Sequence, residues 1–230
     1  MNVPDAVHPL PVELESDGET RRFWPCAVET DRGLVLVDAG FAHTADQLEA
    51  GLAEAGFDLS DVHLAFLTHQ DGDHVGGLAH VVSETGAVVV ASERAARVVD
   101  GSEPPRGSDS GDDRYEPVAV DVALGGEATL DTRAGPARVV PTPGHTPGHV
   151  SLYFEAASFL LAGDAVTAAD GELNGPDPTF TEEMDEALAS VRTLSELDIS
   201  RTLCYHGGFA AAGSDRMAAI VADADADIRR

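Results

Sequence analysis

The stretch that decides how this chain folds is Leu67-Thr68-His69-Gln70-Asp71-Gly72-Asp73-His74-Val75-Gly76-Gly77. It completes an apolar segment, residues 62–67, whose pattern predicts a buried strand. Two imidazoles and two carboxylates follow, and Gly72 lets the backbone turn tightly between them. Carboxylates this close together repel each other unless a cation neutralises them, so the stretch predicts a metal site at a strand end. The alternative is a polar loop on an acidic protein, although such loops seldom carry two histidines at this spacing.

Length and composition indicate a globular protein. With 230 residues, of which 43% are hydrophobic, the chain can bury a large core, and we expect one domain over residues 1–230. No apolar run reaches the roughly 18 residues of a membrane span, and residues 1–10 lack the features of a secretory signal. The two cysteines, Cys26 and Cys204, do not form a disulfide framework. We therefore expect a cytoplasmic protein with no membrane partner.

The charge of the chain is unusual. Its 41 acidic residues face 14 basic ones, all arginine, for a formal net charge of −27. Such a chain repels itself in dilute buffer, whereas in molar salt a Debye length of roughly 3 Å screens the repulsion. The composition therefore resembles proteins of salt-accumulating archaea; the alternative is an acidic protein from a high-GC mesophile. Because no basic stripe is available to neutralise phosphates, we expect no nucleic-acid partner.

The rest of the chain alternates strands and helices in two halves. The pattern predicts a hairpin over residues 23–37, a helix begun by a capping box of Thr44 and Gln47, and a later helix beginning at Thr181. Residues 101–116 predict a mobile surface loop or a lid. Further strands are expected at residues 87–91, 118–124, 128–130, 137–140, 150–154, 158–161 and 202–205. Two β-rich halves with helices outside them predict an α/β (α+β) fold, a four-layer αββα sandwich.

Three later strand ends also carry candidate ligands. Residues 141–149 read Pro-Thr-Pro-Gly-His-Thr-Pro-Gly-His, a rigid turn that carries His145 and His149. The next hairpin ends in Asp164, and the last predicted strand is followed by His206. A single histidine is more often structural than a ligand. Four strand ends that all carry ligands of suitable types nevertheless predict a metal centre.

In this order the motifs resemble those of the metallo-β-lactamase-fold hydrolases, over nearly the whole chain from Asp38 to His206. The family pattern is Thr-His-x-His-x-Asp-His-x-Gly-Gly, then Pro-Gly-His-Thr-x-Gly-His, then Gly-Asp, then a late His. One position departs from it, because Asp71 stands where the pattern has its second histidine.

Carried over position by position, the resemblance implies two metal ions and seven ligands. The ligands of the first metal are His69, Asp71 and His145. The ligands of the second metal are Asp73, His74 and His206. Asp164 is implied to bridge the two ions, whereas Asp38 and His149 match positions that we expect to brace the ligands rather than to bind metal.

The implied cofactors are two divalent metal ions, with zinc as the leading candidate. Asp71 also admits manganese or iron, because a carboxylate is a harder ligand than an imidazole and lowers the charge of the site by one unit. A stricter alternative leaves the first site weakly filled and only the second occupied.

The resemblance implies a metallo-hydrolase in which a hydroxide held by two metals attacks a small ester, lactone or thioester, so the expected partner is a small-molecule substrate. Asp73 is the expected catalytic residue, because it can orient the hydroxide or carry its proton. The alternatives are a mononuclear iron dioxygenase acting on a persulfide, a phosphodiesterase of the same fold, and a non-catalytic metal-stabilised binding domain. The sequence makes no prediction of the oligomeric state.

Overall fold

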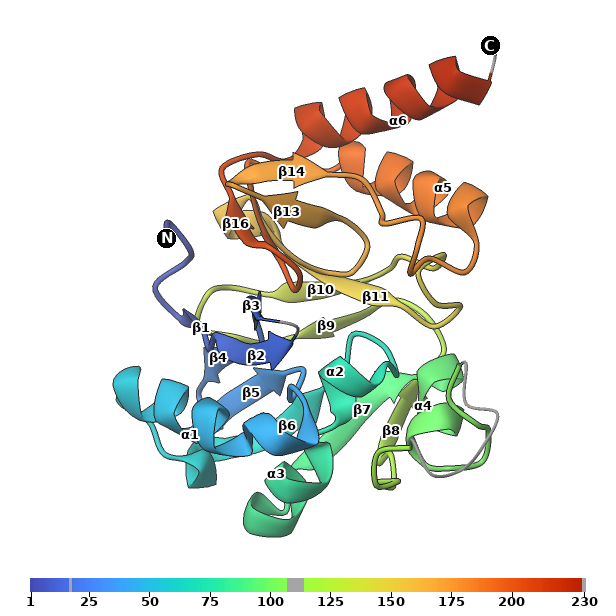
Figure 1. The fold of residues 1–230 in the computed structure, drawn as a ribbon. Coiled ribbons are helices and arrows are strands. Elements are labelled where there is room, and N and C mark those ends of the chain that lie inside the picture. The colour runs from blue at the N-terminus through green and yellow to red at the C-terminus, as the bar shows by residue number, and fades with distance from the viewer. Residues whose placement is uncertain (17, 107–113, 229–230) are drawn as a thin grey trace. The chain divides into compact units, whose positions relative to one another are not determined.

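A computed structural model describes residues 1–16, 18–106 and 114–228, which form two compact units (Figure 1). The amino-terminal unit comprises Asp5–Gly126. The carboxyl-terminal unit comprises Glu127–Arg230 together with Met1–Pro4. The loop or lid expected over residues 101–116 falls partly on residues 107–113, which lie outside the described residues.

The amino-terminal unit is built on a six-stranded sheet with the order β1-β4-β5-β6-β7-β8. The strands are β1 (Val7–Pro9), β4 (Cys26–Thr30), β5 (Gly33–Val37), β6 (Val62–Phe66), β7 (Val88–Ser92) and β8 (Val122–Leu124). The predicted hairpin is β4 and β5, which pair antiparallel. Strands β5 to β8 are parallel, so their carboxyl ends meet at one edge of the sheet. A separate hairpin joins β2 (Val12–Ser16) to β3 (Glu19–Phe23).

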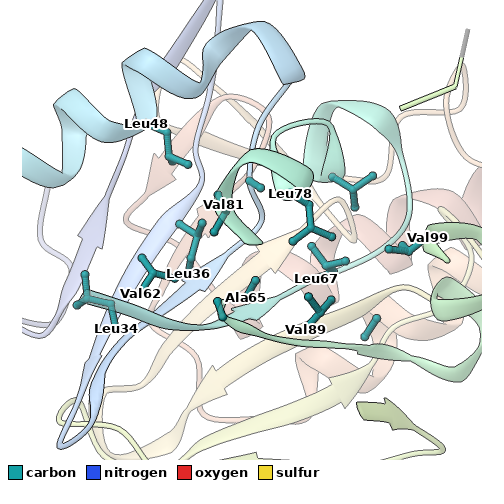
Figure 2. Close-up of a cluster of buried hydrophobic side chains, with 14 of the residues drawn as sticks. Leu34, Leu36, Leu48, Val62, Ala65, Leu67, Leu78, Val81, Val89 and Val99 are labelled. Atoms are coloured by element: carbon teal, nitrogen blue, oxygen red, sulfur yellow. The ribbon is translucent and has the colours of Figure 1, made fainter. Parts of the chain in front are cut away.

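Helices pack on one face of this sheet and close an aliphatic core (Figure 2). The helices of the unit are α1 (Ala45–Glu54), α2 (Gly72–Val75), α3 (Leu78–Thr85) and α4 (Glu93–Val99). Leu48 of α1 and Leu78 of α3 join Leu36 of β5 in one buried cluster. Val35 and Val37 alternate with Leu36 along β5 and are also buried, so both faces of the sheet are apolar.

The carboxyl-terminal unit repeats this plan with the strand order β16-β15-β12-β11-β10-β9. The strands are β9 (Ala128–Leu130), β10 (Ala137–Pro141), β11 (Val150–Phe154), β12 (Phe159–Gly163), β15 (Arg201–Cys204) and β16 (Gly208–Ala210). Helices α5 (Met184–Ser195) and α6 (Ser214–Ile228) lie side by side in Figure 1. Val191 of α5 and Met217 of α6 pack with Leu160 of β12 in the buried core of this unit. The sequence pattern did not predict the small hairpin of β13 (Thr167–Ala169) and β14 (Glu172–Asn174).

The capping box predicted for the first helix is wrong. Helix α1 begins at Ala45, and Thr44 makes no side-chain bond to it; the Thr44 hydroxyl bonds the backbone of Phe41 instead. Gln47 bonds both backbone groups of Glu13, at 2.7 and 3.0 Å, and so ties α1 to strand β2. Gln47 therefore makes a tertiary contact, which a local sequence pattern does not reveal.

Two other boundaries also differ from the prediction. The strand expected over residues 118–124 is confined to β8, because Asp121 bonds the backbone of Val89 through both its own amide and its side chain. Helix α5 begins at Met184 rather than Thr181. Among the helices of the described residues, none has the length and apolar character needed to cross a bilayer.

Gly77 packs closely against the turn that follows β5. A Cβ at this position would lie 2.3 Å from the backbone oxygen of Ala39, which cannot move without shifting the turn. We predict that Gly77→Ala lowers the free energy of unfolding by about 1–3 kcal/mol, the usual effect of overpacking. Urea unfolding followed by circular dichroism measures this loss.

Gly126→Ala is the matched control, because a Cβ at Gly126 would meet no atom within 4 Å. It should change the free energy of unfolding by no more than about 0.5 kcal/mol. Equal stability of the two variants would contradict the close approach at Gly77.

Candidate metal centre

Four of the predicted ligands gather in the amino-terminal unit at the carboxyl end of β6. We call His69, Asp71, Asp73 and His74 the amino-terminal cluster. After β6 ends, the chain bends at Thr68 and continues to Asp71, which is extended and lies immediately before the single turn of α2. The backbone oxygen of Asp71 accepts bonds from the amide of His74 at 2.9 Å and the amide of Val75 at 3.1 Å. This short helix brings the side chains of one turn to the same edge of the sheet.

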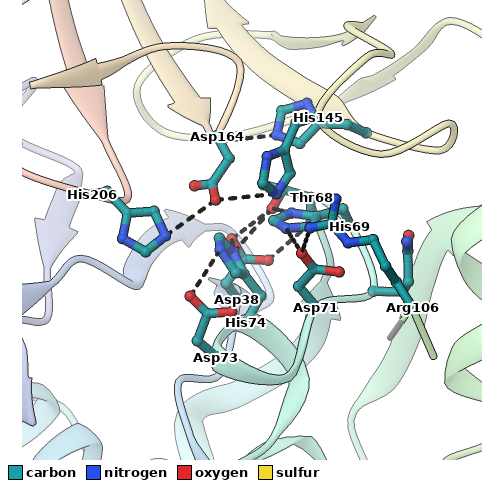
Figure 3. A network of polar contacts seen from close by, with 12 residues as sticks. Asp38, Thr68, His69, Asp71, Asp73, His74, Arg106, His145, Asp164 and His206 are labelled. Atoms are coloured by element: carbon teal, nitrogen blue, oxygen red, sulfur yellow. Dashed lines mark hydrogen bonds and ion pairs between the residues drawn. The ribbon is translucent and has the colours of Figure 1, made fainter. Parts of the chain in front are cut away.

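Asp38, at the end of β5, is the brace of the amino-terminal cluster (Figure 3). Its buried carboxylate accepts the backbone amide of Thr68 at 2.9 Å and the Thr68 hydroxyl at 2.8 Å. His74 Nδ1 lies 2.8 Å from Asp38 Oδ2. Asp38 itself has φ = 60°, a left-handed conformation that aspartate tolerates better than most residues. One buried carboxylate therefore holds the segment after β6 against the end of β5.

These bonds fix the tautomers of both histidines in the cluster. A carboxylate only accepts hydrogen bonds, so His74 donates to Asp38 from Nδ1. The Thr68 hydroxyl donates its only hydrogen to Asp38, so it accepts a hydrogen bond from His69 Nδ1, 3.1 Å away. Each imidazole then carries a lone pair at Nε2, the form that binds a metal.

The other three ligands gather in the carboxyl-terminal unit, and we call His145, Asp164 and His206 the carboxyl-terminal cluster. Asp164 Oδ2 lies 3.4 Å from His145 Nε2 and 3.1 Å from His206 Nε2. One carboxylate oxygen thus faces two imidazole nitrogens, as Figure 3 shows. This is the geometry of a carboxylate that serves two neighbouring positions.

A chain of hydrogen bonds holds Asp164 in place. The backbone amide of Asp164 donates to His149 Nε2 at 2.9 Å, so His149 carries its hydrogen at Nδ1 and donates it to the Thr142 hydroxyl, 2.8 Å away. Thr142 in turn lies 3.0 Å from Ser151 Oγ, which donates to the backbone oxygen of Ala162 at 2.9 Å. Both nitrogens of His149 bond protein atoms, so His149 acts as a brace rather than as a donor to a metal.

Backbone contacts fix the two histidines of the carboxyl-terminal cluster. The amide of Glu182 donates to the backbone oxygen of His145 at 3.2 Å, and the amide of Glu183 donates to that of Gly144 at 2.9 Å. Residues 182 and 183 were predicted as the first turn of a helix, and they instead tie down the turn that carries His145. On the other side, Ala168 of β13 donates to the backbone oxygen of His206 at 3.0 Å.

The donor atoms in each cluster have the spacing that a shared metal ion requires. Two ligands about 2.1 Å from one tetrahedral ion lie roughly 3.4 Å apart. The nitrogen–oxygen separations are 3.6 Å for His69–Asp71, 3.8 Å for His74–Asp73, 3.4 Å for His145–Asp164 and 3.1 Å for His206–Asp164. The residues therefore fit divalent ions both in donor type and in spacing.

Both cysteines are buried and remain thiols. Burial raises the pKa of Cys26 far above its ordinary value, and the nearby Asp38 carboxylate raises it further. Burial and then Asp164 do the same for the pKa of Cys204. A metal-binding cysteine must be a thiolate, so these side chains belong to the core.

Several residues that support the clusters escaped the sequence analysis. Thr68 and Thr142 lie inside the quoted motifs, and Ser151 is a polar residue in an apolar strand, which is a usable signal. Tyr115 donates to the backbone oxygen of Gln70 at 2.8 Å; burial is the main cause that raises its pKa, so it remains a phenol. Arg106 donates to Asp71 from a segment in which no local pattern indicates this contact.

The chain is similar to known proteins over the segment that contains most of these residues. The family model described as the metallo-beta-lactamase superfamily matches residues 27–206. The chain is 29% identical over 201 residues to the probable metallo-hydrolase YflN of Bacillus subtilis (strain 168), with 75% of each chain covered. It is 28% identical over 197 residues to a hydroxyacylglutathione hydrolase of Cereibacter sphaeroides (strain ATCC 17029 / ATH 2.4.9), covering 83% of this chain and 67% of that protein.

A solved structure gives the same result for the fold. The metallo-beta-lactamase family protein TTHA1429 from Thermus thermophilus is 25% identical and matches with a TM-score of 0.75, over 96% of this chain and 80% of that chain. This likeness confirms the fold predicted from the strand-end motifs.

Asp38→Asn tests the brace of the amino-terminal cluster. The amide has the size of the carboxylate, but it places donor hydrogens where Thr68 Oγ1 and His74 Nδ1 both donate to Oδ2. We predict a loss of about 2–3 kcal/mol in the free energy of unfolding of metal-free protein, measured by urea unfolding. Asp46→Asn, on the exposed side of α1, should stay within about 0.5 kcal/mol, and an equal loss in both variants would contradict the prediction.

Thr142→Val tests the chain of bonds behind Asp164. The variant keeps the shape of the side chain but removes the acceptor of His149 Nδ1 and the contact with Ser151. We predict about 1–3 kcal/mol of destabilisation and a roughly 10- to 100-fold loss of metal affinity, measured by competition with a chromophoric chelator. Thr129→Val, on the exposed strand β9, is the control that should change neither quantity; unaltered metal affinity in Thr142→Val would refute the brace.

Proposed function

This chain belongs to the metallo-beta-lactamase superfamily of metal-dependent hydrolases, and we propose that it uses two divalent metal ions to cleave a small ester, lactone or thioester. When bound, such a pair of ions supplies a hydroxide nucleophile at neutral pH and polarises a carbonyl oxygen. The observation that carries the proposal is the single Asp164 oxygen that faces both His145 and His206. A carboxylate placed between two metal positions accounts for this geometry.

The proposed assignment of ligands follows the family pattern. Because it draws ligands from both units, it treats residues 1–230 as one functional domain. His69, Asp71 and His145 would hold the first ion. Asp73, His74 and His206 would hold the second ion, with Asp164 between the two. Zinc fits this mixture of nitrogen and oxygen donors, and the extra carboxylate of Asp71 also suits manganese or iron.

The side chains have distinct tasks in this proposal. Asp38 fixes His74 through Nδ1 and raises its basicity as a ligand, while Thr68 does the same for His69 without a charge. Asp73 is partly exposed, with 21% of its side chain accessible, and it lies 3.8 Å from His74 Nε2. That position suits a carboxylate that accepts the proton of an attacking water and returns it to the leaving group.

The proposed substrate class rests on charge and on relatives. A chain with a net charge of −27 repels polyanions, which disfavours nucleic acids and favours small substrates. The relative named hydroxyacylglutathione hydrolase acts on an acyl group carried by glutathione. Since glutathione carries acyl groups on its thiol, we place thioesters first among the three bond types.

Asp164→Ala and His145→Ala test this function. We predict that both variants lose bound metal and at least about a hundredfold in kcat/KM for a thioester or lactone, more than the loss of an outer-sphere brace produces. His80→Ala is the matched control, because His80 is an exposed histidine paired with Glu49 outside both clusters. Metal content is measured by elemental analysis after purification in high salt, which screens the net charge.

The same protein is assayed with thioester, lactone, ester and phosphodiester substrates. Two equivalents of metal with carbonyl hydrolysis would support the proposal. Turnover of phosphodiesters alone would refute it, and one equivalent of iron with persulfide oxidation would favour a dioxygenase. Full hydrolase activity in Asp164→Ala protein that has lost its metal would also refute it.

A further inference from the structure

The carboxylate of Asp71 is bonded to a cation of the chain itself. Arg106 Nη2 donates to Asp71 Oδ2 at 2.6 Å (Figure 3). The same oxygen lies 3.6 Å from His69 Nε2, the separation expected of two ligands on one ion. The guanidinium therefore engages the oxygen that faces His69.

We propose that Arg106 and a metal ion compete for Asp71, so that Arg106 sets the affinity of the first metal position. This inference rests on the proposed function, because it takes Asp71 and His69 as ligands of one ion. In it, Asp71 has two states: it forms an ion pair with Arg106 at low metal concentration, and it binds the ion when metal is abundant.

The charges explain why the two partners exclude each other. A carboxylate oxygen has lone pairs for more than one donor, so geometry alone permits both contacts. A divalent ion, however, repels a guanidinium a few ångströms away, and the repulsion is twice that from a single positive charge. Arginine never loses its proton in a protein, so Arg106 relieves the repulsion by leaving Asp71. The contact is partly open to solvent, with 31% of the Arg106 side chain and 20% of the Asp71 side chain exposed, which permits this exchange.

The departure from the family pattern explains why the chain has this pair. An imidazole at position 71 would be neutral and would need no counter-charge when the metal is absent. A carboxylate so close to Asp73 raises the negative charge of the cluster, and Arg106 neutralises it. Asp71 and Arg106 thus form one functional unit.

Arg106→Gln tests the competition. We predict that zinc, titrated alone into metal-free protein and followed by calorimetry, binds one of its two positions about tenfold more tightly than in the unsubstituted protein. Tenfold is the order of magnitude for the attraction between two opposite unit charges a few ångströms apart in a water-like medium, which is lost when Arg106 leaves Asp71. Arg97→Gln is the matched control, because it removes the same charge from a pair with Glu103 on the same unit and should leave both affinities unchanged.

The dependence on Asp71 and on salt completes the test. In an Asp71→Asn background, Arg106→Gln should have no effect, since the carboxylate for which they compete is gone. In molar salt the tenfold difference should shrink, because screening weakens a partly exposed charge pair. Arg106→Lys keeps the charge without the fork of donors and should lie between the two extremes.

Two results would overturn the inference while the proposed function stands. Equal zinc affinities in Arg106→Gln and unsubstituted protein would show that the pair has no bearing on the metal. Weaker zinc binding in Arg106→Gln would show that Arg106 braces Asp71 as a ligand instead of competing for it. Absence of zinc binding in every protein tested, the Arg97→Gln control included, would instead refute the metal centre on which the proposed function depends.

Discussion

The buried carboxylate of Asp38 is the interaction on which the amino-terminal cluster depends. It accepts two bonds from Thr68 and one from His74, and so it joins the ends of β5 and β6 to the short helix α2. Without these acceptors, three donors in a buried environment would lack partners, a state that proteins avoid. Since the bonds also fix the tautomers of His69 and His74, the same contact that stabilises the fold orients these two predicted ligands.

Repulsion among carboxylates is the second constraint, and it is met differently at each position. Asp38 accepts hydrogen bonds from buried donors, which stabilise its negative charge. Asp164 faces two imidazoles, Asp71 bonds Arg106, and Asp73 is partly exposed to water. The chain has 41 acidic residues, 14 arginines and no lysine, so few of its carboxylates can have an arginine as partner. Within the amino-terminal unit, the predicted ligand Asp71 thus pairs with a partly exposed cation, whereas Asp38 bonds buried donors.

Most strands could be predicted because their signals are local. A buried strand appears in the sequence as an apolar run. Within the amino-terminal unit, the carboxyl ends of the parallel strands β5 and β6 share an edge, which places Asp38 and the amino-terminal cluster at that edge. The bonds at the start of α1 and the position where α5 starts could not be predicted, because Gln47 bonds Glu13 and Glu183 bonds Gly144, both distant in the sequence. Arg106 was missed for the same reason, since 35 residues separate it from Asp71.

The side chains of the two clusters are held in position by different kinds of hydrogen-bond partner. In one, the charged Asp38 orients His74 and Thr68 relays its effect to His69. In the other, the neutral chain of His149, Thr142 and Ser151 holds the backbone of Asp164, and the carboxylate of Asp164 faces two imidazoles. A cationic partner of the Asp164 side chain would compete with a metal ion for the carboxylate. An anionic partner of a histidine, such as Asp38 beside His74, instead raises the basicity of the imidazole. The type of brace therefore follows from the type of side chain that it supports.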